Sequence, residues 1–202
     1  MLESGRVRVA DRAAGAKSRL LAAGECVEVR DFVPAADAVP QPDPETSLVI
    51  LAAGAGWLVV DKPAGMPVHP LRDDEHGTLT NALVARHPEL IGVGEGGLRS
   101  GVVHRLDVDT SGALLLATDA STYARLRAAF RAHRVRKTYR ALVHGEPPDE
   151  GALDLALAVT QHRPAHVRVM GPGAAADGDA RRTRLAFRTC ERFEGAALLE
   201  VD

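Results

Sequence analysis

The sequence predicts an α+β protein, and three observations lead to this class. Short segments with the apolar spacing of β-strands are intermixed with two segments that have helical spacing. These segments do not form a regular strand–helix–strand repeat, which argues against a doubly wound parallel sheet. Aromatic residues make up only 3% of the 202 residues, so the core must consist mainly of Val, Leu and Ala. We therefore expect a mixed, mainly antiparallel sheet with flanking helices.

The individual elements follow from apolar spacing and from the turn residues between the apolar runs. In the second predicted helix, Tyr123, Leu126 and Phe130 share one face, and Asp119 is a suitable N-cap. The runs SLVIL and GWLVV are expected to be buried strands, followed by a turn at DKPAG. The helices are expected at 78–87 and 119–134, and the strands at 5–9, 26–29, 47–51, 56–60, 101–107, 113–119, 135–143, 183–190 and 196–201, with a loop at 171–180.

A proline-rich segment divides the chain. Residues 34–47 hold four prolines, with acidic residues nearby and no basic ones, a composition typical of an extended linker. We expect a small unit at 1–33 and a larger domain at 48–202. The two short strands of the first unit cannot bury a core alone. They indicate either a β-hairpin appendage or, as we favour, a fragment of a basic RNA-binding module.

Composition excludes several classes of protein. The formal net charge of −2 excludes a uniformly basic, histone-like protein, although locally clustered charge can still bind nucleic acid. Cys26 and Cys190 form no CxxC or Cys/His cluster, so we expect no disulfide framework and no metal site. The N-terminus has no apolar run of a signal peptide, and the 13-residue apolar stretch Leu48–Val60 is too short to span a bilayer. We expect a soluble, cytoplasmic protein.

The densest polar cluster is HRLDVDTSG, residues 104–112. In an extended segment, Arg105 and Asp107 would point to the same side. A carboxylate beside a guanidinium stays ionised at neutral pH, as a nucleophile or general base must. On spacing alone, a surface Asp–Arg pair capping the Thr-Ser-Gly turn is at least as good an interpretation.

A run of basic residues between Ala120 and Gly145 has no acidic residue within it. It indicates contact with a phosphate backbone, although a solvated helix face would also accommodate the charge. Tyr139 lies in this run and could stack on a base or belong to the core. The basic residues are Arg125, Arg127, Arg131, Arg134, Arg136, Lys137 and Arg140.

Two further patterns do not support a cofactor or metal site. GVGEGG at 92–97 matches GxGxxG, but no predicted helix follows it, so a dinucleotide site is not expected. His162 and His166 are four residues apart, but Pro164 between them breaks the helix that a metal-binding pair would need. The sequence therefore predicts no cofactor and no metal.

Three segments together resemble the RluA-type pseudouridine synthases, which act on large-subunit ribosomal RNA. HRLDVDTSG resembles the family's HRLDxxTSG, and RKTYRALVHG at 136–145 resembles its KxYxALVxG strand. DKPAGMPVHP at 61–70 is similar to NKPAGxxVHP, with Asp61 in place of the usual Asn. The segments occur in family order, and the resemblance covers roughly residues 48–202.

The resemblance implies a pseudouridine synthase-like sheet and roles for individual residues. Asp107 would be the catalytic aspartate, attacking the target uridine or abstracting its proton. Arg105 would fill the space left when the uridine is flipped out of its stack, and Tyr139 would stack on the flipped base. The RNA-binding residues would be Arg134, Arg136, Lys137 and Arg140, with Arg6 and Arg8 at the front. The partner would be ribosomal RNA, with transfer RNA as the alternative, and we expect a cofactor-free monomer.

The two ends of the chain also bear on this resemblance. Residues 3–29 resemble the back half of the S-four-type RNA-binding module. In the family, TGRxHQIRxH soon follows a strand like AALLEVD, and its first arginine pairs with the catalytic aspartate. That motif is not among the 202 residues, so we expect a chain truncated at both ends, with a catalytic domain that lacks its C-terminal part. The prediction is an RNA pseudouridine synthase. The alternatives are an impaired RNA-binding fragment or pseudoenzyme and, more remotely, a hydrolase using Asp107.

Overall fold

The computed structural model describes residues 7–10, 12–13, 20–30, 37–162, 165–170 and 181–202. The chain divides into two compact units, Met1–Ala132 and His133–Asp202. Every strand pair formed by the described residues is antiparallel, and two α-helices accompany the sheets in the first unit. The α+β class predicted from the sequence is confirmed.

The front of the first unit forms a small three-stranded sheet in the order β2-β1-β3. β1 (Val7–Val9) pairs with β2 (Arg12–Ala13) and with β3 (Val27–Val29). Of these strands only Val9 is buried. The predicted alternation at the front of the chain therefore does form strands, which are short and largely exposed.

A second three-stranded sheet, in the order β4-β5-β6, carries the main core of the first unit. Along β5 (Trp57–Lys62), side chains at every second position are buried, as the period of a strand requires. β5 pairs with β6 (Gly112–Ala117) over its whole length, from Trp57 opposite Ala117 to Lys62 opposite Gly112. β4 (Val49–Gly54) pairs with β5 at the edge, and all its residues are exposed, so its predicted burial was wrong.

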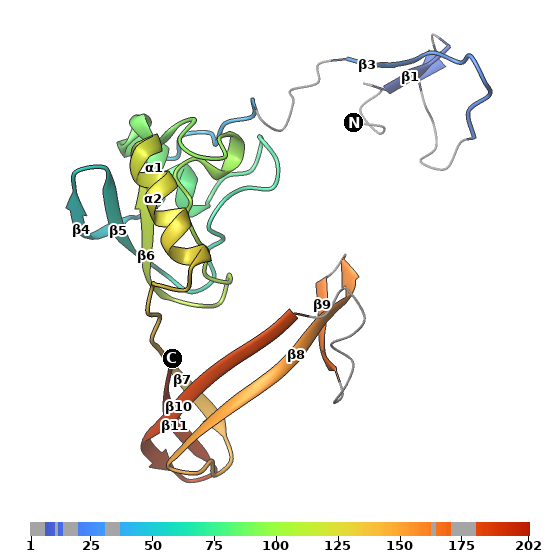
Figure 1. The fold of residues 1–202 in the computed structure, drawn as a ribbon. Helices are drawn as coiled ribbons and strands as arrows, with labels where there is room; N and C mark the ends of the chain where they lie inside the picture. The colour runs from blue at the N-terminus through green and yellow to red at the C-terminus, as the bar shows by residue number, and fades with distance from the viewer. Residues whose placement is uncertain (1–6, 11, 14–19, 31–36, 163–164, 171–180) are drawn as a thin grey trace. The chain divides into compact units, whose positions relative to one another are not determined.

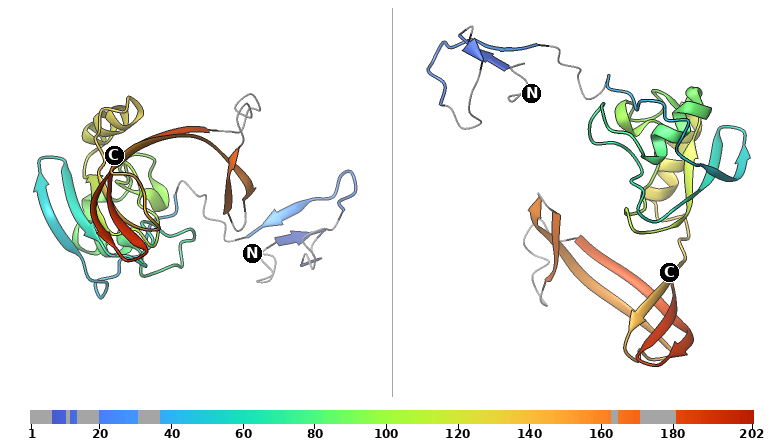
Figure 2. Two further views of the ribbon diagram at one scale, coloured as in Figure 1. Left: turned by 90° about the horizontal axis from the view of Figure 1, so that it is seen from below. Right: turned by 180° about the vertical axis from the view of Figure 1, so that it is seen from behind.

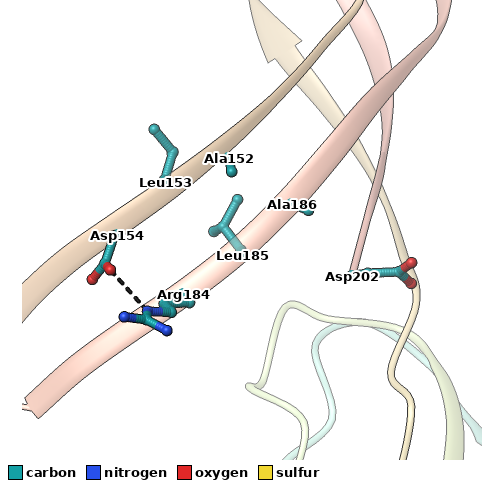
Figure 3. Close-up of a pocket in the computed structure, with 7 residues that line it drawn as sticks. All are labelled: Ala152, Leu153, Asp154, Arg184, Leu185, Ala186 and Asp202. Carbon is teal, nitrogen blue, oxygen red and sulfur yellow. Dashed lines mark hydrogen bonds and ion pairs between the residues drawn. The ribbon is translucent and has the colours of Figure 1, made fainter.

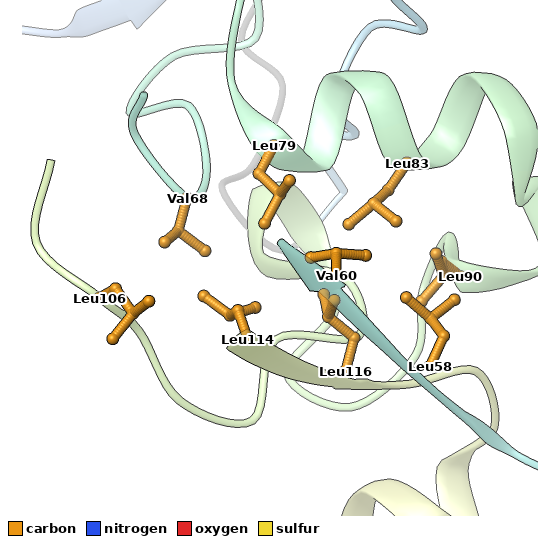
Figure 4. Close-up of a cluster of buried hydrophobic side chains, with 9 residues drawn as sticks. All are labelled: Leu58, Val60, Val68, Leu79, Leu83, Leu90, Leu106, Leu114 and Leu116. Atoms are coloured by element: carbon orange, nitrogen blue, oxygen red, sulfur yellow. The ribbon is translucent and has the colours of Figure 1, made fainter. Parts of the chain in front are cut away.

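Alternation along β6 creates two apolar clusters, one on each face of the strand. Leu114 and Leu116 belong to the larger cluster, whose nine side chains are drawn in Figure 4. Ala117 belongs to the smaller one, against which Leu115 of β6 and Tyr123, Leu126 and Phe130 of α2 pack. The larger cluster consists of Leu58, Val60, Val68, Leu79, Leu83, Leu90, Leu106, Leu114 and Leu116.

The two helices begin where the sequence predicts. α1 (Leu79–Arg86) has a capping box, in which the Thr78 side chain accepts from the Asn81 backbone and the Asn81 side chain accepts from Thr78. α2 (Ala120–Arg131) is capped by Asp119, which accepts from the Thr122 backbone N–H at 2.9 Å. That hydrogen bond, with one from the Ser121 hydroxyl, lowers the pKa of Asp119 to about 2. The α2 cap therefore stays ionised throughout the physiological pH range.

Between α1 and β6 the chain has only short 3-10 turns and loops. The turns are η1 (Pro88–Leu90) and η2 (Gly97–Arg99). Residues 101–107 were predicted as a strand, but they form a loop with one isolated bridge, Val102 to Leu116. The glycine-rich 92–97 segment leads into η2 and not into an α-helix, in agreement with the sequence. Gly94 lies against the Tyr123 ring, where a larger residue would clash.

Residues 38–46, in the segment expected to be a free linker, contact α1. The Asp43 N–H donates to the Asn81 carbonyl at 3.0 Å, and the Asn81 side chain donates to the Gln41 carbonyl at 2.7 Å. Arg86 donates to the Pro44 carbonyl at 2.9 Å. The prolines exclude regular structure here, but the backbone is held by the helix. The division of the chain at 34–47 remains a prediction.

The second unit is a five-stranded sheet in the order β7-β11-β10-β8-β9. Its strands are β7 (Tyr139–His144), β8 (Glu150–His162), β9 (Ala165–Met170), β10 (Arg181–Phe193) and β11 (Ala196–Val201). β8 and β10 are long and lie side by side in Figures 1 and 2. The predicted strands at 183–190 and 196–201 are confirmed, and β7 begins at Tyr139 instead of residue 135. β8 and β9 were not predicted, and the predicted loop at 171–180 lies outside the described residues.

Truncation of a core leucine should destabilise the first unit selectively. Leu116 has no exposed surface, so Leu116→Ala should lower the free energy of unfolding by about 2–5 kcal/mol through lost burial and the cavity left behind. Leu51→Ala is the matched control, because Leu51 in β4 is 53% exposed and should change it by less than about 1 kcal/mol. Urea unfolding followed by the fluorescence of Trp57, the single tryptophan, measures both. Equal effects would contradict this view of the core.

Candidate active site

Asp107 lies in the loop between the Val102 bridge and β6, and its backbone is fixed from both sides. Before it in the chain, Leu106 is buried in the larger core cluster. After it, the Val108 carbonyl accepts from the Gly65 N–H at 2.8 Å, and the Thr110 N–H donates to the Asp107 carbonyl at 3.1 Å. The loop therefore holds Asp107 in place without being part of a strand.

Lys62 also fixes this loop, through hydrogen bonds to three backbone carbonyls. Its side chain has no exposed surface, and its ammonium donates to the carbonyls of Pro63 and Met66 at 2.8 Å and of Val108 at 3.0 Å. Burial lowers the pKa of Lys62, while the charges of Asp109 and Asp107 act in the opposite direction. One buried cation thus joins the DKPAG turn to the backbone beside Asp107.

Sequence reasoning missed Lys62, although a signal for it was present. Leu58 and Val60 are buried on one face of β5, and Lys62 follows them at the same two-residue spacing. A lysine at a buried position of a strand must find acceptors, because an isolated buried charge is very costly. The sequence predicted a turn and a family-like motif at DKPAG, but no role for Lys62.

Arg105 and Asp107 project on the same side of the loop, as predicted, although the loop is not a strand. The nearest guanidinium nitrogen of Arg105 lies 3.7 Å from a carboxylate oxygen of Asp107. The Asp107 side chain is 86% exposed and that of Arg105 66%. An ion pair this open contributes little to stability, so both groups are available to a ligand.

His104 connects this loop to the two neighbouring elements. Its Nε2 atom accepts from the Leu115 N–H of β6 at 3.0 Å, which leaves the ring proton on Nδ1. Its ring stacks on Phe130 of α2, with ring centroids 4.6 Å apart. His104 therefore acts as a spacer that fixes the start of the Asp107 loop against β6 and α2.

Tyr139 and the basic residues around it belong to the second unit. Tyr139 is the first residue of β7, opposite Val201, and is 39% exposed. Arg134 and Lys137 are exposed on the segment that leads into β7. The structure thus brings Arg105 and Asp107 together within the first unit, whereas Tyr139 and these two basic residues are presented by the second.

Carboxylates from elsewhere in the chain partner several members of the basic run. Arg136 lies 2.8 Å from Asp202, and Arg140 lies 3.1 Å from Glu200. Arg127, in the first unit, lies 3.3 Å from Glu95. The lack of acidic residues within the run therefore did not mean a lack of acidic neighbours in space, and part of the charge is compensated internally.

The two predicted RNA-binding residues at the front are only partly described. Arg8 lies on β1, opposite Ala13 on one side and Glu28 on the other, and is half-buried. Arg6 lies outside the described residues. Their role in RNA binding remains a prediction.

A pocket of about 360 Å³ lies on the sheet of the second unit (Figure 3). Its lining is mainly Leu153, Leu185 and small residues of β8 and β10. Asp154 at its rim is paired with Arg184 at 2.8 Å and with Arg182 at 2.6 Å. None of the predicted site residues lines this pocket, and its charged groups are already paired, so we do not assign the reaction to it.

Among the described residues, no three His, Cys, Asp or Glu side chains gather in an arrangement that could hold a metal ion. No helix in the described part of the chain is long and apolar enough to cross a membrane.

Comparison with known proteins identifies the family. The sequence pattern of the RNA pseudouridylate synthase family matches residues 56–201. An uncharacterized RNA pseudouridine synthase of Chloroflexus aurantiacus is 41% identical over 141 residues, which cover 70% of this chain and 42% of that protein. The ribosomal large subunit pseudouridine synthase D of Zymomonas mobilis is 38% identical over 144 residues, 71% of this chain and 44% of that protein. The chain belongs to the RNA pseudouridylate synthase family, and its resemblance to the RluA type is confirmed.

Solved structures agree at the level of the fold. Human RNA pseudouridylate synthase domain containing 4 superposes with a TM-score of 0.57 and 23% identity, over 76% of this chain and 57% of that one. Such identity shows the fold alone. The chain spans less than half the length of the Chloroflexus and Zymomonas relatives.

The Lys62 anchor can be tested by removing its charge. Lys62→Met keeps a similar shape but leaves the Pro63 and Met66 carbonyls without this donor, and it should lower the free energy of unfolding by about 1–3 kcal/mol. Lys137→Met removes an exposed lysine and should leave the Trp57-detected urea transition unchanged. If Lys62→Met unfolds at the same urea concentration as the parent, the buried ammonium does not hold this turn.

Proposed function

We propose that this protein isomerises uridine to pseudouridine in structured RNA, with ribosomal RNA as the expected substrate. The observation that carries the proposal is the Asp107 carboxylate, exposed on a backbone fixed by Lys62 and Gly65, within the region that matches the family. The relative from Zymomonas mobilis is named for the large ribosomal subunit, which supports ribosomal RNA over transfer RNA.

The proposed reaction requires the uracil to leave its stack before Asp107 can reach it. An enzyme that acts on a base must extrude the nucleotide, and the vacated position needs a substitute. Arg105, adjacent to Asp107 and largely exposed, has the length and charge to fill that position while contacting the RNA. Tyr139 of the second unit is the residue we assign to stacking on the extruded base.

The chemistry balances without an external reactant. The bond from ribose to N1 of uracil breaks, the base turns, and a bond forms from ribose to C5. C5 loses a proton and N1 gains one, so no redox change and no net group transfer occurs. Asp107 acts as the nucleophile or as the base that removes a proton. Water must be excluded while the base is detached, because hydrolysis would otherwise release it.

Tritium release from RNA labelled at uridine C5 tests the reaction. Asp107→Asn should reduce release by at least about 10³-fold, in line with the loss of an essential nucleophile or base. Asp73→Asn is the matched control, since it makes the same chemical change on an exposed side chain outside the Asp107 loop, and it should keep release within a few-fold of the parent. Release that survives Asp107→Asn would exclude this assignment.

RNA binding without any release would favour the alternative, an RNA-binding fragment or pseudoenzyme of the same family. The hydrolase interpretation would be favoured if the protein had no affinity for RNA at all.

The basic segment before β7 should contribute to RNA affinity through phosphate contact. Lys137→Gln should weaken binding similarly for different RNA sequences and lower the slope of log K against log salt by about 0.7–0.9, the value of one released counterion. Arg182→Gln, in the same unit but paired with Asp154 at 2.6 Å, should leave the slope unchanged. Filter binding of a uridine-containing RNA hairpin at several salt concentrations measures both, and a parent-like slope for Lys137→Gln contradicts the contact.

A further inference from the structure

A pocket of about 140 Å³ lies beside Arg105 in the first unit. It is formed where the segment after β5, the glycine-rich loop, the Asp107 loop and α2 meet. Its volume leaves room for several water molecules, and therefore for a tetrahedral oxyanion. Its polar lining consists of His69, Glu95, Arg99, His104, Arg105 and Arg127.

The pocket carries an excess of positive charge. Three arginines line it, and Glu95 supplies the single carboxylate of its lining. Glu95 lies 3.6 Å from Arg99 and 3.3 Å from Arg127, both longer than a good charge-assisted hydrogen bond. Because the Arg99 and Glu95 side chains are about half exposed, their pairing is weak and a stronger anion can displace it.

One arginine of the pocket is already oriented by the backbone. Arg127 donates to the Val103 carbonyl at 3.0 Å, which holds its guanidinium at the pocket while other N–H groups of the fork stay available. Arg99 is the last residue of η2, and Arg105 lies in the Asp107 loop. The three cations thus converge from different elements, which suits an anion with several oxygens.

The buried imidazole nitrogen of His69 is the second observation that points to an anion site. Its Nδ1 atom is buried and has no hydrogen-bond partner in the described structure. Burial lowers the pKa of His69, and the charges of Arg99 and Arg105 lower it further, while Glu95 acts against them. A half-buried imidazole with an unsatisfied nitrogen beside three arginines can donate to an anion once one is bound.

We propose that this pocket binds a phosphate group of the RNA backbone close to the target uridine, with Arg99 and His69 as binding residues that the sequence did not suggest. The proposal rests on the function proposed above. Arginine forks match phosphate oxygens in geometry and charge, and contacts of this kind fix the register of a nucleic acid without reading its sequence. Because Arg105 lines the pocket and also lies 3.7 Å from Asp107, a phosphate held here would set the nucleotide beside the carboxylate.

Titration with inorganic phosphate, followed by NMR of the His69 ring, tests the pocket without RNA. Bound phosphate should raise the pKa of His69, since an anion stabilises the imidazolium form. Arg99→Gln should weaken phosphate binding ~3- to 10-fold, and Glu95→Gln should strengthen it by a similar factor, because each removes one charge of opposite sign. No response of the His69 pKa to phosphate would overturn the proposal.

The control variants use an exposed ion pair of the same unit. Arg72 lies 3.1 Å from Asp74, and both side chains are about 70% exposed. Arg72→Gln and Asp74→Asn make the same charge changes as the two pocket variants and should leave phosphate binding at His69 unchanged. Equal effects of control and pocket variants would show that only the overall charge matters, which also overturns the proposal.

RNA binding separates this proposal from the function on which it rests. Arg99→Gln should lower the salt slope for the RNA hairpin by about 0.7–0.9 and reduce tritium release through a higher KM. If release depends on Asp107 but Arg99→Gln keeps the parent slope and KM, the phosphate pocket is wrong and the activity stands. If the parent protein neither binds RNA nor releases tritium, the proposed activity fails, and with it the assignment of the pocket to RNA.

Discussion

The position of the Asp107 loop depends on one buried cation. The Lys62 ammonium reaches three backbone carbonyls, two in its own turn and one directly after Asp107. Without the ammonium, the Pro63 and Met66 carbonyls would need another donor and the Val108 carbonyl would keep only the Gly65 N–H; the ammonium itself would otherwise be an isolated buried charge. The same hydrogen bonds satisfy the backbone carbonyls and the buried charge, so the DKPAG turn and the Asp107 loop stabilise each other. This explains how an irregular loop can present a reactive carboxylate at a defined place.

Several helices and strands were predictable because the residues that determine them are neighbours in the sequence. The N-cap of α2 was predicted correctly at Asp119, because capping depends on residues within three positions. The start of α1 was predicted within one residue, at 78. β5, β6 and β11 were also found, since each has apolar side chains at the spacing or in the continuous run of a buried strand. These elements supply most of the core, and the fold class followed from them.

The elements that were predicted wrongly or not at all are those whose structure depends on contacts with residues distant in the sequence. GVVHRLD has the composition of a strand, but only Val102 finds a bridging partner. The rest is held by backbone hydrogen bonds of Gly101 and by buried side chains such as Leu106. β8 carries Leu153, Leu155 and Leu157 at alternating positions, but alanines at the intervening positions 152, 156 and 158 weaken the contrast between apolar and polar residues on which a strand prediction depends. The candidate site was predictable where a motif is contiguous, as for Arg105 and Asp107. Arg99 and His69 are far apart in the sequence and meet only through the fold, so no local pattern could reveal their pocket.

The pairing of β5 with β6 has a consequence for the order of folding. Trp57 pairs with Ala117 and Lys62 with Gly112, so the whole of α1 and both 3-10 turns lie inside the loop that these strands close. Closing a loop of this length carries an entropy cost before any contact compensates for it, and such topologies fold more slowly than local ones. During synthesis, β5 must therefore wait for β6 to leave the ribosome. Leu79 and Leu83 of α1, which belong to the same core cluster as Leu58 and Val60 of β5, leave the ribosome before β6 does.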